Sequence, residues 1–242
     1  MPRTIRSIDL SRDIPLVLAL LSLGLVAATA AADAEKKETS DYYLTAIAGG
    51  SFATGEAEGE TFSGDFAGSS HDQSAFAGAA LGTILELGFI DLRLELEGTG
   101  GRSFTFTTPS SGGLYVTDAD VWTLQGNFWF EYSLGRLFPN TPIVRDLAPF
   151  GGGGLGLSRV SLATTHGAEI GRSDSSKLAW QGGVGLSYQP LPWLSFEARY
   201  QYIDMGGASV PLYSGAGRQG TMEIDLGANE VIGGIRFNFS EL

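Results

Sequence analysis

Residues 91–98 read DLRLELEG, a stretch in which three leucines alternate strictly with three charged residues. A period of two places the leucines on one face of a β-strand and the charges on the other. An arginine that faces lipid at mid-depth in a membrane costs about 2–4 kcal/mol, so in a membrane barrel the charges must face inward. The stretch therefore predicts a two-faced strand: in a soluble sheet its charges would meet water, and in a membrane barrel its leucines would face lipid.

The first 32 residues have the pattern of an export signal. Three arginines precede an apolar run over residues 14–26, and small residues follow, with candidate cleavage sites after Ala30 and Ala32. The run is shorter than the roughly 20 residues of a membrane anchor. We expect a signal peptide at 1–32, cleaved near Ala32, a short periplasmic leader at 33–41 and a barrel at 42–242.

Composition excludes several functional classes. The formal charge of the 242-residue chain is −12, and loss of three arginines and two aspartates with the signal makes it one unit more negative. This argues against a nucleic-acid partner, which requires basic patches. There is no cysteine, which excludes disulfides, thiolate catalysis and cysteine-bound metals. No segment after the signal is long and apolar enough for a membrane helix, so any crossing must use strands.

Alternation and turn residues together predict eight strands in an all-β fold. Each reaches the 9–11 residues that a tilted transmembrane strand needs. We expect an eight-stranded antiparallel up-and-down transmembrane barrel with both termini on the periplasmic side and four long polar outer loops, the first at 53–72. The predicted strands are 42–52, 74–85, 91–104, 119–133, 148–160, 177–189, 194–204 and 229–239.

The polar faces of these strands predict a lumen network, with Trp129 as an exception in the pattern of its strand. The predicted network is Arg93, Glu95, Glu97, Gln125, Asn127, Glu131, Glu197, Arg199, Gln201, Glu230, Arg236 and Asn238. The interior of an eight-stranded barrel is just wide enough for side chains to fill. The network is therefore either a salt-bridged plug or a narrow pore that prefers cations.

Aromatic residues gather near the predicted strand ends, as in the interfacial girdles of membrane barrels. Trp122 and Trp180 are expected at the outer membrane boundary. Tyr132, Tyr188, Phe237 and Phe239 are expected at the inner boundary. Scattered core aromatics of a soluble barrel would not separate by strand end.

The order of these motifs resembles a known family. APFGGGGLGLS (148–158), LRLELEGTG (92–100), VWTLQGNFWFEY (121–132), AWQGGVGLSY (179–188), FEARYQYIDM (196–205) and EVIGGIRFNF (230–239) resemble strands of opacity-type porins and OmpA-like membrane domains. The resemblance implies an eight-stranded barrel in the outer membrane of a Gram-negative bacterium, of the surface-antigen type. It also implies lipid, lipopolysaccharide and the barrel-assembly machinery as partners.

Two features depart from that family. Its barrels commonly end on an aromatic residue, whereas Phe239 is followed by Ser240, Glu241 and Leu242. The sequence also ends with the barrel, so we expect no peptidoglycan-binding domain.

The sequence predicts no enzyme, cofactor or metal site. His71 and His166 fall in predicted outer loops without a recognisable third catalytic group, and the acidic loop 53–72 does not have the spacing of an EF-hand. Weak binding of divalent cations by that loop is a secondary hypothesis. The leading hypothesis is a monomeric barrel with a structural or surface-interaction role towards host or cell-surface ligands. A small-solute or ion channel is the alternative, and a lipid-modifying enzyme is third.

Overall fold

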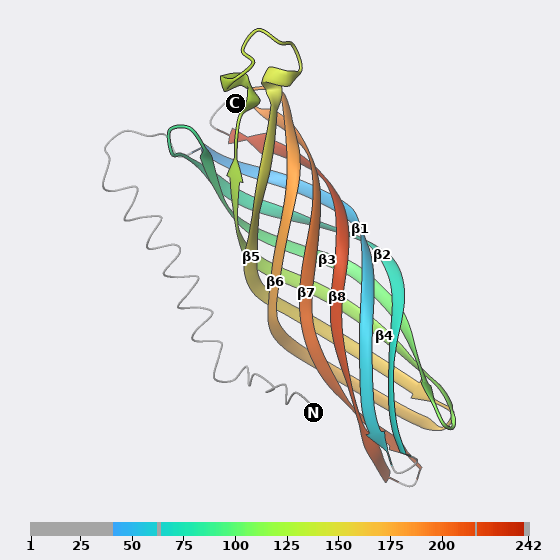
Figure 1. The fold of residues 1–242 in the computed structure, drawn as a ribbon. Coiled ribbons are helices and arrows are strands. Elements are labelled where there is room, and N and C mark those ends of the chain that lie inside the picture. Colours follow the sequence, from blue (N-terminus) through green and yellow to red (C-terminus); the bar gives the residue numbers. More distant parts are fainter. Residues whose placement is uncertain (1–40, 62–63, 216, 240–242) are drawn as a thin grey trace. The chain divides into compact units, whose positions relative to one another are not determined.

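The computed structural model describes residues 41–61, 64–215 and 217–239, which form a closed ring of eight antiparallel strands (Figure 1). Each strand pairs with its neighbour in chain order, and the last pairs with the first. The predicted fold class is thereby confirmed. The expected signal peptide and most of the expected leader lie outside the described residues. The strands are β1 Asp41–Thr61, β2 Gly64–Glu86, β3 Asp91–Ser110, β4 Gly113–Glu131, β5 Leu147–His166, β6 Glu169–Leu191, β7 Leu194–Ser214 and β8 Gly217–Asn238.

The strands are far longer than the sequence predicts, at 19 to 23 residues each. The predicted outer loop 53–72 is wrong, because these residues form the paired ends of β1 and β2 around residues 62–63. The other three outer loops are likewise replaced by strand, with 111–112, 167–168 and 215–216 as connections. Inward-facing Ala53, Ala57 and Phe66 pack into a shared core, and this packing overrides a locally polar composition.

The outer surface of the barrel divides into two bands. Exposed apolar side chains such as Phe52, Phe128 and Val184 surround the half that contains the start of β1 and the end of β8, which we call the lipid belt. Beyond Trp122 and Trp180 the outward side chains are mostly polar or charged. About ten residues of each strand lie in this outer extension, which at about 3.3 Å per residue and a tilt of about 40° rises about 25 Å.

The opening stretch of the sequence lies as expected within the lipid belt. Leu92, Leu94 and Leu96 are on the outer face of β3, and the three charged residues between them are buried inside. Among the described residues, no helix is long and apolar enough to cross a bilayer.

Two strands change the face that they present to the interior. On β3 the inward positions run from Arg93 to Thr99, and a register shift then makes Arg102 the next one. Gly101 sits in this shift with a φ of 90°. β7 shows the same change at Gly206, where φ is 75°. A β-bulge of this kind inserts one residue and reverses the alternation beyond it.

The ring is loosened in the outer extension at two seams. In the described parts of β2 and β3, the ladder ends at the pair Ala77 and Gly100. Beyond it, side chains of β2 accept hydrogen bonds from backbone N–H groups of β3, at Ser74 from Ser103 (3.0 Å), at Asp72 from Thr105 (2.7 Å) and at Ser70 from Thr107 (3.3 Å). The β6–β7 ladder is interrupted between Gly171 and Trp180.

Candidate functional site

The predicted lumen residues all lie on the inward faces of their strands. Eleven of the twelve are buried, and the Glu197 side chain is 8 % exposed. They occupy the half of the interior inside the lipid belt, which we call the polar zone. Four of the eight strands, β3, β4, β7 and β8, supply all twelve residues.

Arg93 is the centre of the ion-pair cluster nearer the start of β1. Its guanidinium lies 2.5 Å from Glu95, 2.8 Å from Glu131 and 3.0 Å from Glu197. Arg236 contacts two of the same carboxylates, Glu131 at 3.4 Å and Glu197 at 3.0 Å. Buried charges are tolerated when they are paired in this way, and removing one partner leaves the others uncompensated.

A second cluster lies deeper in the barrel and crosses its full width. Arg199 pairs with Glu97 at 2.8 Å, and Arg102 pairs with Glu230 at 2.7 Å. A chain of amides joins the two pairs, from Gln201 through Gln181 and Asn127 to Glu97, with donor–acceptor distances of 2.8 to 3.3 Å. The network thus connects opposite walls of the barrel.

Aromatic side chains complete the polar zone. The Trp129 indole donates to Glu95 at 2.8 Å, and the Tyr43 hydroxyl donates to the same carboxylate at 2.8 Å. The Arg199 guanidinium lies 4.9 Å from the centroid of the Trp129 ring. Trp129, the exception in the sequence pattern, is therefore an inward residue with a polar partner for its N–H group.

Sequence reasoning missed Arg102, Tyr43 and Gln181 as members of this network. Tyr43 and Gln181 lie on strands whose small residues hide the alternation, and Arg102 follows the bulge. With Arg102 included, four arginines face five glutamates. Among the described residues, the Gln125 side-chain amide makes no hydrogen bond, and the Asn238 side chain donates to the Pro192 carbonyl at 3.1 Å.

An apolar zone fills the interior of the outer extension. Its side chains come from all eight strands except β6, and each is at most 7 % exposed. The largest are Phe66, Phe104, Phe106, Tyr115, Leu162, Ile203, Met205, Leu212, Met222, Ile224 and Leu226. Arg102 marks the boundary of the polar zone, with its guanidinium 4.0 Å from the centroid of the Phe76 ring. The interior therefore passes from salt-bridged to apolar along the barrel axis.

Stacked rings cap the apolar zone at its outer end. The Tyr115 ring lies between Phe66 and His166, with centroid separations of 4.4 and 4.3 Å. The Tyr115 hydroxyl donates to Glu169 at 2.8 Å. Burial, and then the adjacent Glu169 carboxylate, raise the pKa of Tyr115 to about 12. The phenol is thus held in its protonated form.

His166 is the histidine with candidate catalytic neighbours. Its Nε2 lies 3.4 Å from Ser110, and its Nδ1 lies 3.6 Å from Glu169. The order serine, histidine and carboxylate suits nucleophilic catalysis, but both separations exceed ordinary hydrogen bonds. Glu169 accepts from Tyr115, and the Ser110 hydroxyl lies 3.1 Å from the Gly113 carbonyl. These contacts describe a polar cap over the apolar zone.

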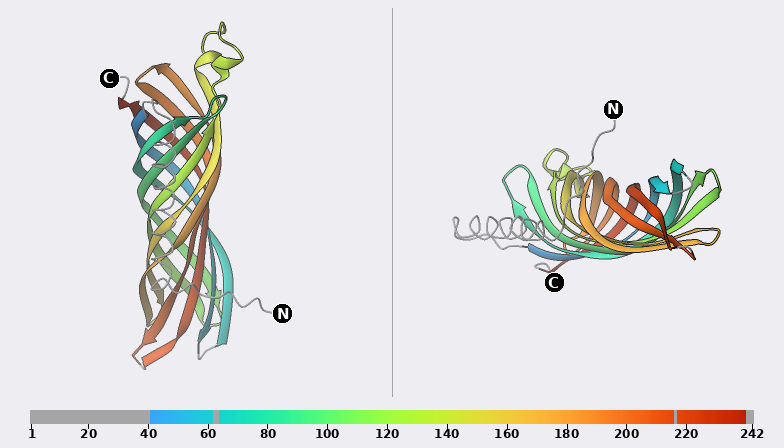
Figure 2. Two further views of the ribbon diagram at one scale, coloured as in Figure 1. Left: turned by 90° about the vertical axis from the view of Figure 1, so that its left-hand side faces the viewer. Right: turned by 90° about the horizontal axis from the view of Figure 1, so that it is seen from below.

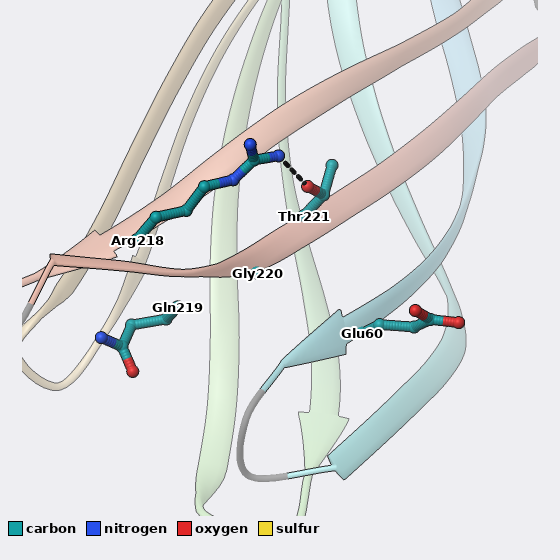
Figure 3. Close-up of a pocket in the computed structure, with 5 residues that line it drawn as sticks. All are labelled: Glu60, Arg218, Gln219, Gly220 and Thr221. Atoms are coloured by element: carbon teal, nitrogen blue, oxygen red, sulfur yellow. Dashed lines mark hydrogen bonds between the residues drawn. The ribbon is translucent and has the colours of Figure 1, made fainter.

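Two open recesses lie on the outside of the extension, one lined by Glu60 and Arg218 and the other by Asp118 and Arg172. The recess in Figure 3 has a volume of about 390 Å³ and lies between β1 and β8. Arg218 donates there to Thr221 at 2.7 Å, and the Glu60 carboxylate points away from it. In residues 41–61, 64–215 and 217–239, no three metal-binding side chains converge. Divalent-cation binding near residues 53–72 stays a hypothesis.

Comparisons with known proteins place the chain in a family. No curated protein sequence matches it. Among solved structures it is similar to Neisserial surface protein A (16 % identity, 84 % of this chain and 100 % of that one, TM-score 0.43). It is also similar to the outer membrane protein OprG from Pseudomonas aeruginosa (14 % identity, 81 % of this chain and 95 % of that one, TM-score 0.48). The outer membrane protease OmpT from Escherichia coli is similar over 84 % of this chain and 99 % of its own, at 8 % identity and a TM-score of 0.48. The model of the outer membrane protein beta-barrel domain matches residues 18–231, so the chain belongs to that family of outer-membrane barrels.

Proposed function

We propose that this outer-membrane barrel is a non-conducting surface protein that acts through its outer extension. The observation that carries the proposal is the apolar zone, which fills the interior of the extension with side chains at most 7 % exposed. An ion or polar solute would have to cross this packed region, where the buried polar side chains are a few hydroxyls such as those of Thr117 and Thr164, which bond to each other at 3.0 Å. A surface-interaction role, like that of an adhesin or antigen, then falls to the exterior of the extension.

The polar zone also supports a plug rather than a pore. Each of its arginines is paired with a carboxylate, and the charge excess is one glutamate. Paired groups hold one another across the lumen and leave little field to attract a free cation. A narrow channel for ions or small solutes is therefore the second candidate. A lipid-modifying enzyme is the third, and rests on the loose cluster at His166.

Conductance measurements on the reconstituted barrel test the first half of the proposal. The chain from Asp33 to Leu242 is refolded into planar bilayers, with the heat-dependent shift in gel mobility as proof of folding. We expect no discrete current steps from the wild type. Phe104→Ala/Phe106→Ala, which empties part of the apolar zone, serves as the matched opened variant. Reproducible wild-type steps that change on Glu97→Gln would establish the channel and end the plug proposal.

Cell attachment tests the second half. A Gram-negative strain without adhesins of its own is made to display the barrel, and its attachment to cultured epithelial cells is counted. We expect more attachment than with the empty vector. The double variant Glu56→Gln/Glu58→Gln, on the outer face of β1, should change the number of attached cells. Leu96→Ile in the lipid belt should leave that number unchanged. Equal attachment with and without the barrel would exclude adhesion to these cells.

Other partners follow from the location. We propose that the monomer contacts outer-membrane lipid along the lipid belt and lipopolysaccharide at the outer edge of the belt, near Trp122 and Trp180. During insertion it would contact the barrel-assembly machinery. The acidic exterior of the extension would project away from the membrane, towards ligands on a host cell or a neighbouring cell.

A further inference from the structure

The connection between β4 and β5 carries apolar side chains that the protein does not bury. It runs through residues 132–146 and contains two short 3-10 turns, η1 Leu134–Arg136 and η2 Val144–Asp146, neither of which has a buried residue. We call it the foot loop. The exposed fractions of Leu137, Phe138 and Ile143 are 59, 48 and 63 %.

A second connection at the same end has the same character. In the turn between β2 and β3, Leu87 and Phe89 are 52 and 72 % exposed. Arg136 of the foot loop joins the two connections, since its guanidinium donates to the Gly88 carbonyl and pairs with Asp91 at 3.1 Å. The exposed apolar side chains of the two connections therefore belong to one fixed structure.

The foot loop begins where the lipid belt ends. A hydrocarbon layer about 25 Å thick needs about ten tilted residues, which from Trp122 at the outer boundary reaches Tyr132. Phe128 and Phe130, on the lipid side of β4, lead directly to the loop. Figures 1 and 2 show the loop projecting beyond the other connections at this end of the barrel. Its apolar surface is thus continuous with a surface already assigned to lipid.

Most backbone N–H groups in the outer part of the foot loop are bonded within the loop. Seven N–H groups between residues 136 and 146 donate to carbonyls of the loop, at 2.8 to 3.3 Å. Two further positions are proline and have no N–H group. A segment that enters the membrane interface must satisfy its backbone internally, because hydrocarbon offers no partners. A loop that lies in water does not need to pair its backbone N–H groups internally, because water can bond to them.

A strained backbone conformation holds one apolar side chain of the foot loop on the outside. Ile143 has a φ of 69° and a ψ of −52°, the geometry of a classic γ-turn closed by the bond from the Val144 N–H group to the Pro142 carbonyl, which is strained for a β-branched residue. Its side chain is exposed, so the strain brings no packing inside the protein. Arg145 beside it is 58 % exposed at the side chain and contacts only its neighbour Asp146, at 3.3 Å, among the described ion pairs. An apolar residue next to an accessible cation suits an acyl chain beside a phosphate.

We propose that the foot loop, with the β2–β3 turn, binds the phospholipid leaflet at the end of the barrel where β1 starts and β8 ends. Leu137, Phe138, Ile143, Leu87 and Phe89 enter the boundary between acyl chains and headgroups next to Tyr132, and Arg145 contacts headgroup phosphates. The foot loop thereby fixes the depth of the barrel from one side. Arg136 is a positioning residue, because it holds the two connections together.

Single-cysteine probes test the proposal, because the natural chain has no cysteine. Phe138→Cys and Ile143→Cys carry an environment-sensitive dye in vesicles of phosphatidylethanolamine and phosphatidylglycerol that contain nitroxide-labelled lipid. Phe128→Cys in the lipid belt and Thr107→Cys on the exposed face of the extension are the controls. We expect lipid quenching of the foot-loop probes at least half that of Phe128→Cys, and aqueous iodide quenching several-fold below that of Thr107→Cys.

The opposite result is equally readable. If both foot-loop probes behave like Thr107→Cys in folded barrels, the patch faces water and the proposal is wrong; a periplasmic protein partner would then be the subject to pursue. In a second arm, Arg145→Gln is compared in vesicles with and without phosphatidylglycerol. We expect the foot-loop probe to lose lipid quenching with Arg145→Gln in both vesicles, and more strongly where the anionic lipid is present. Lipid quenching that Arg145→Gln leaves unchanged in both vesicles would exclude the phosphate contact.

Discussion

Arg102 illustrates how one glycine changes the role of a residue. The alternation of β3 places residues 93, 95, 97 and 99 inside, and continued without a break it would place residue 102 in contact with lipid or water. The bulge at Gly101 reverses the phase and brings Arg102 to Glu230 on the opposite wall. The pair Gly100-Gly101 is visible in the sequence, but a bulge and a simple weak strand share that signal.

Gly101→Ala should weaken the barrel because alanine resists its φ of 90°. We expect a loss of about 1–2 kcal/mol in the free energy of unfolding, measured by urea titration in vesicles. Gly100→Ala is the matched control, since its φ is ordinary and an added Cβ would have its nearest contact at 3.8 Å. Equal losses for the two variants would show that the bulge is not the cause.

Arg102→Leu should be more harmful than loss of both members of its ion pair. The single change leaves the buried Glu230 carboxylate without its arginine, at an expected cost of about 3–5 kcal/mol. Adding Glu230→Leu should recover much of that loss in the same urea titration. Additive losses in the double variant would mean that the pair is not coupled.

Tyr115 should make the outer end of the barrel sensitive to alkali. Its pKa is about 12 when folded, against about 10 when unfolded, so the folded state holds the proton more tightly. The resulting stability is fully present below pH 10 and is lost as pH rises through 12. Tyr115→Phe should reduce the loss of unfolding free energy across that window. An unchanged pH profile would exclude Tyr115 as the cause.

At the scale of elements, local composition predicts the membrane half of each strand but not its continuation. Belt segments such as β4 around Phe128 alternate large apolar and polar residues, so their faces can be predicted from sequence. The first hairpin is rich in glycine, serine and acids, and its strands persist because opposite walls share a core. The four distal hairpins do carry a local signal, a positive-φ glycine at each, which polar loops also contain.

The β2–β3 seam should open when its side-chain contacts are removed. Asp72 accepts from the Thr105 N–H group at 2.7 Å in place of a backbone carbonyl. In Asp72→Ala we expect amide exchange of Thr105 to accelerate about five- to tenfold, the equivalent of one lost hydrogen bond. Gln73→Ala, on the exposed face, is the control. Unchanged exchange at Thr105 would show that the seam is held by packing alone.

At the scale of the whole molecule, the barrel combines two environments along one axis. The half surrounded by the lipid belt has lipid outside and ion pairs inside, whereas the outer extension has polar groups outside and an apolar zone inside. The sequence predicts the first arrangement, since membrane strands have that pattern. It does not predict the second, because the core of the extension is assembled from positions that are distant in the chain.

The height of the extension can be measured directly. A donor dye at Ser111→Cys, beyond the outer end of β3, should lie about 25 Å above acceptor lipids at the membrane surface, as estimated by energy transfer. Trp122→Cys, at the boundary, should give nearly complete transfer. Transfer from Ser111→Cys as strong as from Trp122→Cys would mean that the distal strands lie folded onto the membrane.

The double-sided distal strands also limit how this surface can vary under immune or phage selection. Outward residues alternate one by one with residues of the apolar zone, so only every second position can change freely. Inserting a single residue would exchange the two faces of everything beyond it. Sequence variation in the extension should consist of alternate point substitutions, and changes of length should be confined to the four hairpin tips.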